Sequence, residues 1–137
     1  MNTPLVHLNP PELWDSTLNH HSQGILVEPG RQAVFSGQIA VQKDTDHIPV
    51  SLKEQTEVVC RNLGHCLDSV GASPADIVSL RLYIVDWAPP KASEVLEPLA
   101  TFLGDGMPAM TAIGVSALFS PELKIEIEMV ARVPDRS

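Results

Sequence analysis

The stretch that decides the fold runs from Gly106 to Val133, with the sequence GMPAMTAIGVSALFSPELKIEIEMVARV. It predicts two β-strands joined by a loop. The second strand alternates in polarity, because successive side chains of a strand point to opposite faces. One face is expected to hold Ile125, Ile127, Met129 and Ala131, and the other Lys124, Glu126, Glu128 and Arg132. The apolar face predicts a core, whereas the charged face is solvated, paired across a subunit contact, or part of a site.

Length and composition set the class of protein. A chain of 137 residues is typical of one domain that buries its own core, so residues 1–137 are expected to form a single domain. Hydrophobic residues make up 44% and charged residues 19%, which is typical of a folded globular protein. A net charge of −8 opposes binding to phosphate backbones, so no nucleic-acid or anionic-membrane partner is expected. The start of the chain has no signal-peptide pattern, and no apolar run reaches membrane-spanning length, which predicts a cytoplasmic protein.

The N-terminal third is expected to be an arm followed by two strands. Residues 1–19 contain prolines and little periodicity, which predicts an extended arm that packs on the surface or on a neighbouring subunit. Strands are expected at residues 25–27 and 32–41, joined as a hairpin by the Pro-Gly pair in the turn at 28–31. Gly37 interrupts the second strand, which indicates a bulge or a close approach to the backbone.

The middle of the chain changes to a helical period. Apolar residues recur at three- and four-residue steps from Ser51 to Val70, which predicts an amphipathic helix. Ser51 is suited to the N-cap, with Glu54 completing a capping box. A β-branched strand is expected at residues 77–86, and a second helix at residues 91–103.

The predicted order is therefore β-β-α-β-α-β-β. It favours an α+β two-layer sandwich in which both helices cover one face of a single sheet. Arg81 and Tyr83 are expected on the other face, together with Glu126 and Glu128. Charged residues beside apolar neighbours on a sheet face favour a contact between copies of the chain.

Common catalytic and metal-binding motifs are missing from the sequence. It has no glycine-rich phosphate loop, no metal-ligand pattern and no nucleophile elbow, so neither a metal nor a cofactor is expected. Cys60 and Cys66 fall in the same predicted helix, too far apart in rise to form a disulfide. They are expected to be free thiols that pack as small hydrophobes.

Five side chains remain as candidates for chemistry. His20 and His21 are adjacent, so on an extended segment one can serve a site while the other is solvated; two polar loop histidines are the commoner case. Glu126 and Glu128 share a strand face, where a carboxylate can act as a general acid or base or orient a water, or can pair with Arg81 or with a cation of a neighbouring subunit. Arg81 can bind a carboxylate with its two-pronged guanidinium, although a structural ion pair is the more frequent role.

Several segments, taken together and in order, resemble the RidA (YjgF) family. They are Val34-Phe35-Ser36-Gly37-Gln38, the helix segment 55–63, Pro108-Ala109-Met110-Thr111-Ala112, and the strand 125–131. The resemblance covers the chain from about His21 to Ala131. It implies a chorismate-mutase-like fold that assembles as a homotrimer, with ligand clefts between subunits. It also implies hydrolysis of reactive imino and enamino acids to keto acids and ammonia, without a metal or an organic cofactor.

The resemblance assigns roles to individual residues. Glu126 matches the family glutamate that positions the attacking water, and His21 stands where the family commonly has tyrosine. The backbones of Gly37 and Ala112 match positions that contact the ligand. Ser36 and Thr111, which flank these positions, complete the predicted ligand-binding set, together with Met110 and Arg81.

Met110 departs from the family pattern. The deaminase branch has arginine here, which forks onto the carboxylate of the substrate. Methionine cannot form that charge-assisted contact, whose loss costs roughly 2–3 kcal/mol and on the order of 10²-fold in substrate capture. The chain therefore resembles the arginine-lacking subgroups.

Three functions follow from this reading. The first is hydrolysis of a small imine, enamine or related C–N substrate that does not need carboxylate capture by the usual arginine. The second is noncatalytic binding or sensing of a small metabolite in the same cleft. The third is an endoribonuclease, which the acidic charge balance makes the least favoured. As an alternative within this scheme, Arg81 replaces the missing arginine and binds the carboxylate of an acidic substrate. The sequence does not identify the substrate.

Overall fold

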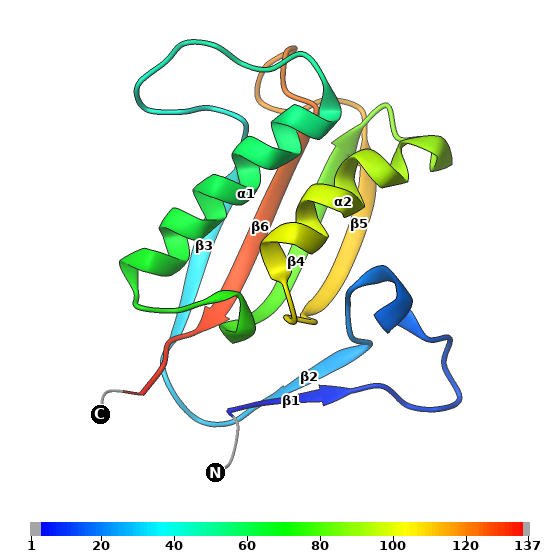
Figure 1. Ribbon diagram of the computed structural model, residues 1–137, viewed down its shortest axis with the longest axis vertical. Coiled ribbons are helices and arrows are strands. Elements are labelled where there is room, and N and C mark those ends of the chain that lie inside the picture. The colour runs from blue at the N-terminus through cyan, green and yellow to red at the C-terminus, as the bar shows by residue number, and fades with distance from the viewer. Residues whose placement is uncertain (1–3, 136–137) are drawn as a thin grey trace.

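The structure, a computed structural model, describes residues 4–135. Its strands and helices follow one another as shown in Figure 1. They are β1 (Leu5–Leu8), β2 (Gly24–Val27), β3 (Gln32–Gln38), α1 (Leu52–Ser69), β4 (Ile77–Val85), α2 (Ala92–Leu103), β5 (Ala109–Val115) and β6 (Ile125–Arg132). Short 3₁₀ helices lie at Ser16–Asn19, Pro74–Asp76 and Pro89–Lys91.

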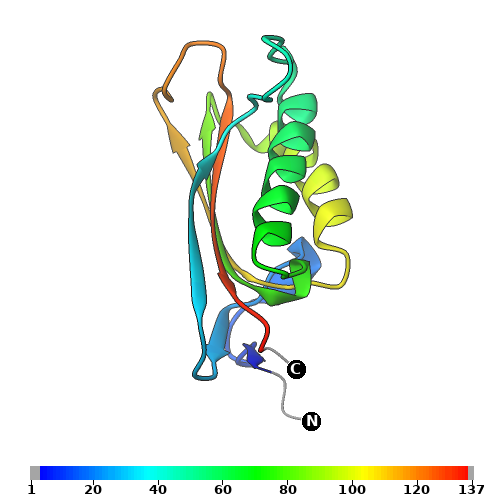
Figure 2. The ribbon, with the colours of Figure 1, turned by 90° about the vertical axis from the view of Figure 1, so that its left-hand side faces the viewer.

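A four-stranded sheet in the order β3-β6-β4-β5 forms one layer of the molecule. Strand β6 pairs antiparallel with β3 and with β4, whereas β4 and β5 run parallel. Both helices pack on the same face of this sheet, as Figure 2 shows edge-on. The predicted α+β two-layer sandwich is confirmed.

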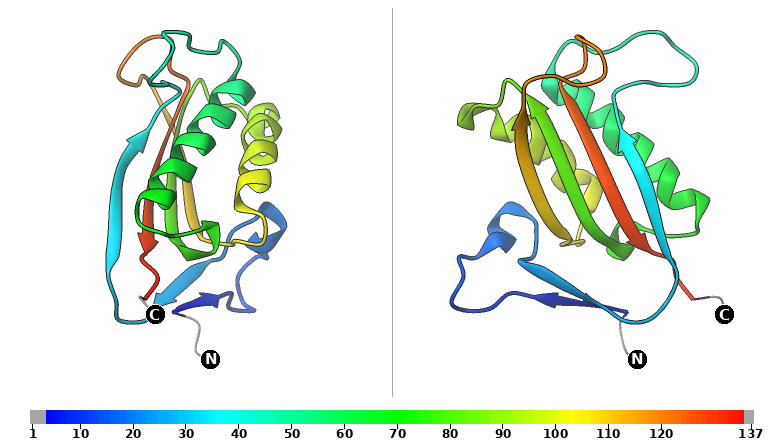
Figure 3. Two further views of the ribbon diagram at one scale, coloured as in Figure 1. Left: turned by 60° about the vertical axis from the view of Figure 1, so that its left-hand side comes forward. Right: turned by 180° about the vertical axis from the view of Figure 1, so that it is seen from behind.

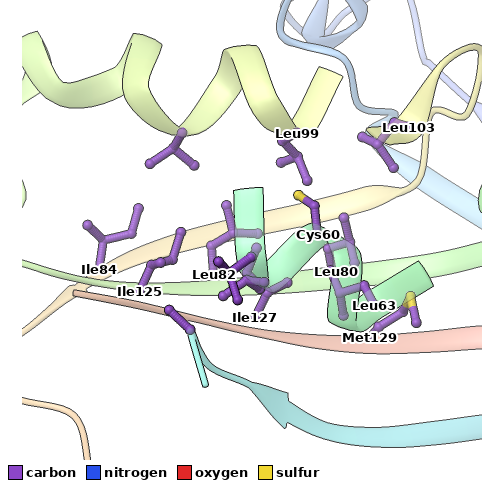
Figure 4. Packing of buried hydrophobic residues seen from close by; sticks show 14 of the residues in the cluster. Cys60, Leu63, Leu80, Leu82, Ile84, Leu99, Leu103, Ile125, Ile127 and Met129 are labelled. Carbon is purple, nitrogen blue, oxygen red and sulfur yellow. The ribbon is translucent and has the colours of Figure 1, made fainter. Parts of the chain in front are cut away.

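The core lies between the sheet and the two helices. The apolar face of β6 is buried as the alternation predicted: Ile125, Ile127, Met129 and Ala131 are each at most 1% exposed. In Figure 4, Ile125, Ile127 and Met129 point into the same core as Cys60 and Leu63 of α1 and Leu99 of α2. Full removal of such side chains from water stabilises the fold by about 1.5–3 kcal/mol each.

Helix α1 begins and ends as the sequence predicted, within one residue. The Ser51 side chain accepts a hydrogen bond from the backbone N–H of Glu54, at 3.1 Å, which satisfies a free donor of the first turn. Gly71 follows the helix with a φ of 68°, a left-handed conformation that glycine adopts without a steric penalty. Both cysteines are free, and Cys60 is buried in the core as expected.

The predicted hairpin between the first two strands is wrong, and so is their place in one sheet. Strand β2 pairs with β1 in a separate two-stranded sheet, whereas β3 pairs with β6 (Figure 3). Arg132 stabilises this path of the chain, because its guanidinium donates to the backbone oxygens of Glu28 and Pro29 at 3.1 and 2.5 Å. These bonds hold the connection from β2 to β3 against the end of β6, so the chain passes from one sheet to the other.

The predicted N-terminal arm is only partly extended. Residues 1–3 of it lie outside the described residues, and Leu5–Leu8 forms β1, an additional strand before the predicted order. Ser16–Asn19 forms a 3₁₀ helix, which begins at Asp15 because that side chain accepts from the N–H of Thr17 at 3.0 Å. The prolines hid these short elements, since they interrupt any periodic pattern. Within residues 4–135, no helix combines the length and apolarity that a bilayer crossing needs.

Candidate functional site

The sheet divides the predicted site residues between its two faces. Residues paired directly across strands point to the same face. Ala112 is paired with Leu82, which is buried beneath the helices, so Ala112 and likewise Met110 belong to the helix side. Thr111 is paired with Arg81, and both lie on the opposite face, which we call the open face.

Glu126 lies on the open face, directly over the backbone of Gly37. A Cβ atom added to Gly37 would stand 2.3 Å from a carboxylate oxygen of Glu126. The pairing of β3 with β6 shifts register between Phe35 and Gln38, which confirms the bulge predicted at Gly37. The close approach predicted there is also confirmed. Ser36 is exposed in the same bulge, so three predicted site residues are neighbours.

A second polar group lies beside Glu126 on the open face. The hydroxyl of Tyr83 donates to the Glu128 carboxylate of the neighbouring strand. This hydrogen bond, together with the negative charge of Glu128, raises the pKa of Tyr83 above its ordinary value of 10.0. Arg81 is exposed and stands across from Glu128 in the pairing of β4 with β6. Glu128 therefore accepts a hydrogen bond from Tyr83, whereas Glu126 lies against the backbone of Gly37.

The helix side holds a pocket of about 280 Å³ between β5, α2 and the loop before β2. His21, Met110 and Ala112 all line it, together with Trp87. A single chain therefore brings three of the predicted residues together in this pocket. It places Glu126, Gly37, Ser36, Thr111 and Arg81 on the other face of the sheet.

The loop before β2 fixes the orientation of His21. His20 adopts a φ of 64°, which turns the chain, and the hydroxyl of Ser16 donates to the His21 backbone oxygen at 2.8 Å. The ring atom Nδ1 of His21 lies 3.2 Å from the backbone oxygen of Asn19. Trp14 packs edge-on against the ring, with centroids 5.7 Å apart. Of the two adjacent histidines, His21 is the one that reaches the pocket.

Comparison with known proteins places this geometry in a family. Residues 15–133 match the model of the family described as Endoribonuclease L-PSP. The chain belongs to this family. The Rid and YjgF proteins among its relatives confirm the resemblance seen in the sequence.

Relatives of this chain include proteins from bacteria, archaea and yeast. A Rid-family protein of unknown function from Yersinia pestis superposes with a TM-score of 0.89 at 32% identity, covering 95% of this chain and 99% of that one. A RutC family protein from Pyrococcus abyssi is 32% identical over 112 residues, 81% of this chain and 84% of its own. Escherichia coli TdcF with bound serine superposes with a TM-score of 0.68 at 27% identity, covering 85% of this chain and 88% of that one.

Sequence reasoning did not place the other lining residues of this pocket in a site, among them Trp87 and Leu96. Trp87 and Leu96 line it beside Met110, from the segment after β4 and from α2. The sequence signal for Trp87 was Gly114, a glycine inside β5 that marks a close approach to the backbone. In the structure, a Cβ atom added at Gly114 would lie 3.2 Å from the Cβ of Trp87. A larger cavity of about 590 Å³ between α1 and α2 holds none of the predicted site residues. Within residues 4–135, no cluster of three or more His, Cys, Asp or Glu side chains is arranged to hold a metal.

Proposed function

We propose that this protein hydrolyses a small imine, enamine or related C–N substrate in a cleft between subunits of a homotrimer. The observation that carries the proposal is the position of Glu126, a half-buried carboxylate seated on the backbone of Gly37 beside an open sheet face. Family membership supports action on a small molecule. The reaction and the assembly are our proposal.

The division of the site between two faces favours assembly. His21 and Met110 lie on one side of the sheet and Glu126 on the other, so one chain alone does not bring them together. The open face also exposes apolar side chains, with Val34 77% and Ile113 45% accessible. A second copy that covers this face buries these side chains and closes a cleft, as expected for a symmetric oligomer.

Glu126 and His21 have distinct roles in the proposed reaction. The Glu126 carboxylate accepts a hydrogen bond from a water and directs the water oxygen at the carbon of the C=N bond. A C–O bond forms and the C=N π electrons move to nitrogen, which takes up the proton that the water loses, with His21 relaying that proton. The C–N bond then breaks, releasing ammonia and leaving a carbonyl product. One imine and one water are consumed for each carbonyl compound and ammonia formed.

Met110 limits the substrates that fit this scheme. The side chain is partly buried, packs against the core and offers no charge to a carboxylate. TdcF is a relative whose structure holds an amino acid, serine. We propose that the substrate here does not depend on carboxylate capture at position 110.

Release of ammonia from a panel of imines tests the reaction. The comparison is between the unchanged protein and Glu126→Ala, with Glu128→Ala as the matched control on the same strand. We expect Glu126→Ala to lower the rate about 10²-fold or more, and Glu128→Ala to keep most of it, because Glu128 is bound by Tyr83. Equal rates for the unchanged protein and Glu126→Ala would remove Glu126 from the mechanism. Ligand-induced thermal shifts without turnover would favour a noncatalytic binding protein.

Mixing two inactive variants tests the intersubunit cleft. Glu126→Ala and His21→Ala are each expected to be inactive. After unfolding and refolding them together, some clefts receive His21 from one chain and Glu126 from another, and part of the activity returns. Absence of any recovery, with trimers present in sedimentation, would contradict a cleft that takes His21 and Glu126 from different chains.

Arg81 offers a direct test of the acid-binding alternative. It is exposed on the open face, across from Thr111 and Glu128, where its guanidinium is accessible to an anion. If Arg81 replaces the missing arginine, Arg81→Ala abolishes turnover of 2-imino acids; unchanged turnover excludes that role. Endoribonuclease activity remains the least favoured function at a net charge of −8, and the cytoplasmic location stays a prediction.

A further inference from the structure

The pocket on the helix side is lined mainly by apolar side chains, and its polar lining residues are Asn19 and His21. Its floor is made by Leu82, Ile84 and Val95, which are at most 2% exposed and belong to the core. Its rim is made by Trp87, Leu96 and Met110. Among the described residues that line this pocket, none carries a charged side chain. A pocket of this kind binds apolar surface and disfavours an ion, because an ion loses its hydration without gaining a partner.

His21 supplies a hydrogen-bond acceptor at the edge of the pocket. A carbonyl oxygen accepts hydrogen bonds and cannot donate, so the contact of Nδ1 with the Asn19 oxygen at 3.2 Å requires Nδ1 to carry the proton. In the uncharged ring, Nε2 then keeps its lone pair. A ligand that meets this atom must offer an N–H or O–H group.

From these two observations we infer that the pocket selects a compact, uncharged, largely apolar ligand that donates one N–H or O–H to His21. Trp87 and Leu96 are its specificity-determining residues, because they form the rim between the floor and solvent. A volume of about 280 Å³ accommodates a single ring or a short branched chain. This inference rests on the proposed function in one respect, that this pocket is the substrate side of the cleft.

Two tryptophans make binding directly measurable. The chain contains only Trp14 and Trp87; one packs on His21 and the other lines the pocket. The probes are benzamide and benzoate, which have nearly the same shape but differ in charge and in the N–H donor. Benzamide is expected to change the tryptophan fluorescence and raise the melting temperature, and to bind at least about tenfold tighter than benzoate. Toluene, which lacks the donor, is expected to bind more weakly than benzamide.

Matched variants identify the residues responsible. Met110→Arg is expected to reverse the preference for benzamide over benzoate and to increase the affinity for benzoate about tenfold or more. Met110→Leu is expected to keep the preference for benzamide. Trp87→Ala is expected to weaken the binding of benzamide about tenfold. In this variant Trp14 remains as the fluorescent reporter. His21→Phe is expected to remove the difference between benzamide and toluene. Phe119→Ala, a change at a side chain that is 94% exposed away from the pocket lining, is the control and should change nothing.

Three results would overturn this inference: equal binding of benzamide and benzoate, tighter binding of benzoate by the unchanged protein, or no binding of either. All three measure binding alone. The proposed hydrolysis is tested by a separate measurement, the comparison of ammonia release by the unchanged protein and by Glu126→Ala. A protein that binds benzamide selectively but releases no ammonia supports the pocket and contradicts the hydrolase.

Discussion

The two faces of strand β6 differ in role, although their residues alternate along the same strand. Ile125, Ile127 and Met129 are buried by the helices, and their contacts connect both layers of the fold. Glu126 and Glu128 alternate with them but are half-buried on the open face, against Gly37 and Tyr83. Stability should therefore depend mainly on one face and function on the other. Single substitutions one residue apart can separate the two.

The sharpest test compares Ile127→Ala with Glu126→Ala. Ile127 is fully buried, and its truncation leaves a cavity between the sheet and the helices, which should lower the free energy of unfolding by about 2–5 kcal/mol. Glu126→Ala should change it by less than about 1 kcal/mol, because the carboxylate contacts a glycine backbone at the surface. Urea unfolding of both variants measures the difference. Similar losses at the two positions would show that the open face also stabilises the fold.

This division was predictable from the sequence because its cause is local. The alternation of β6 follows from the two-residue period of a strand, and the stripe on α1 from the helical period. Ser51 and Gly71 set the ends of α1 through contacts with residues nearby in sequence. The same local rules indicated that Gly37 was a place of close approach. The partner found there, Glu126, is a long-range contact.

Arg132 is the exception on β6. It occupies the charged register but is only 4% exposed, because the connection from β2 to β3 covers it. Arg132→Ala removes the bonds to the Glu28 and Pro29 oxygens and should cost about 2–3 kcal/mol. Arg132→Lys is the matched variant, and it should recover little of that loss because an ammonium group cannot reproduce the planar fork. Full recovery by Lys would show that only the charge is needed.

The pairing of the N-terminal strands was not predictable from the sequence, and neither was the burial of Arg132, because both depend on the same long-range contact. Nothing local to the turn at 28–31 says that its carbonyls are bound by a side chain some hundred residues away. A Pro-Gly turn between two short strands is typical of a hairpin, and only the long-range contact redirects β2 toward β1. The pocket was missed on similar grounds: His21, Trp87, Leu96 and Met110 come from four separate segments.

Gly37→Ala tests whether the function of Glu126 depends on its position against the backbone of Gly37. The new methyl group would overlap the Glu126 carboxylate at 2.3 Å, so the side chain must rotate away. Because a surface carboxylate can move, we expect a stability loss of only about 1 kcal/mol. Activity should nevertheless fall nearly as far as in Glu126→Ala, since the carboxylate is misplaced. The control is Gly64→Ala on α1, where the nearest side-chain atom is 3.9 Å away and activity should be unchanged.

The smallest effect is expected at Tyr83, on the open face. Its hydrogen bond to Glu128 favours the uncharged phenol, so the pKa in the folded state lies above the ordinary value of 10.0. The contribution of this bond to stability is complete below pH 10 and is lost as the pH rises through the pKa of the folded state. Tyr83 is the single tyrosine of the chain, so ultraviolet titration of the phenolate reports this pKa alone. Glu128→Ala should return it toward 10.0, and Glu126→Ala should leave it unchanged, because the two carboxylates of the open face have different partners. A fall in the Tyr83 pKa with Glu126→Ala would mean that both carboxylates belong to one connected network.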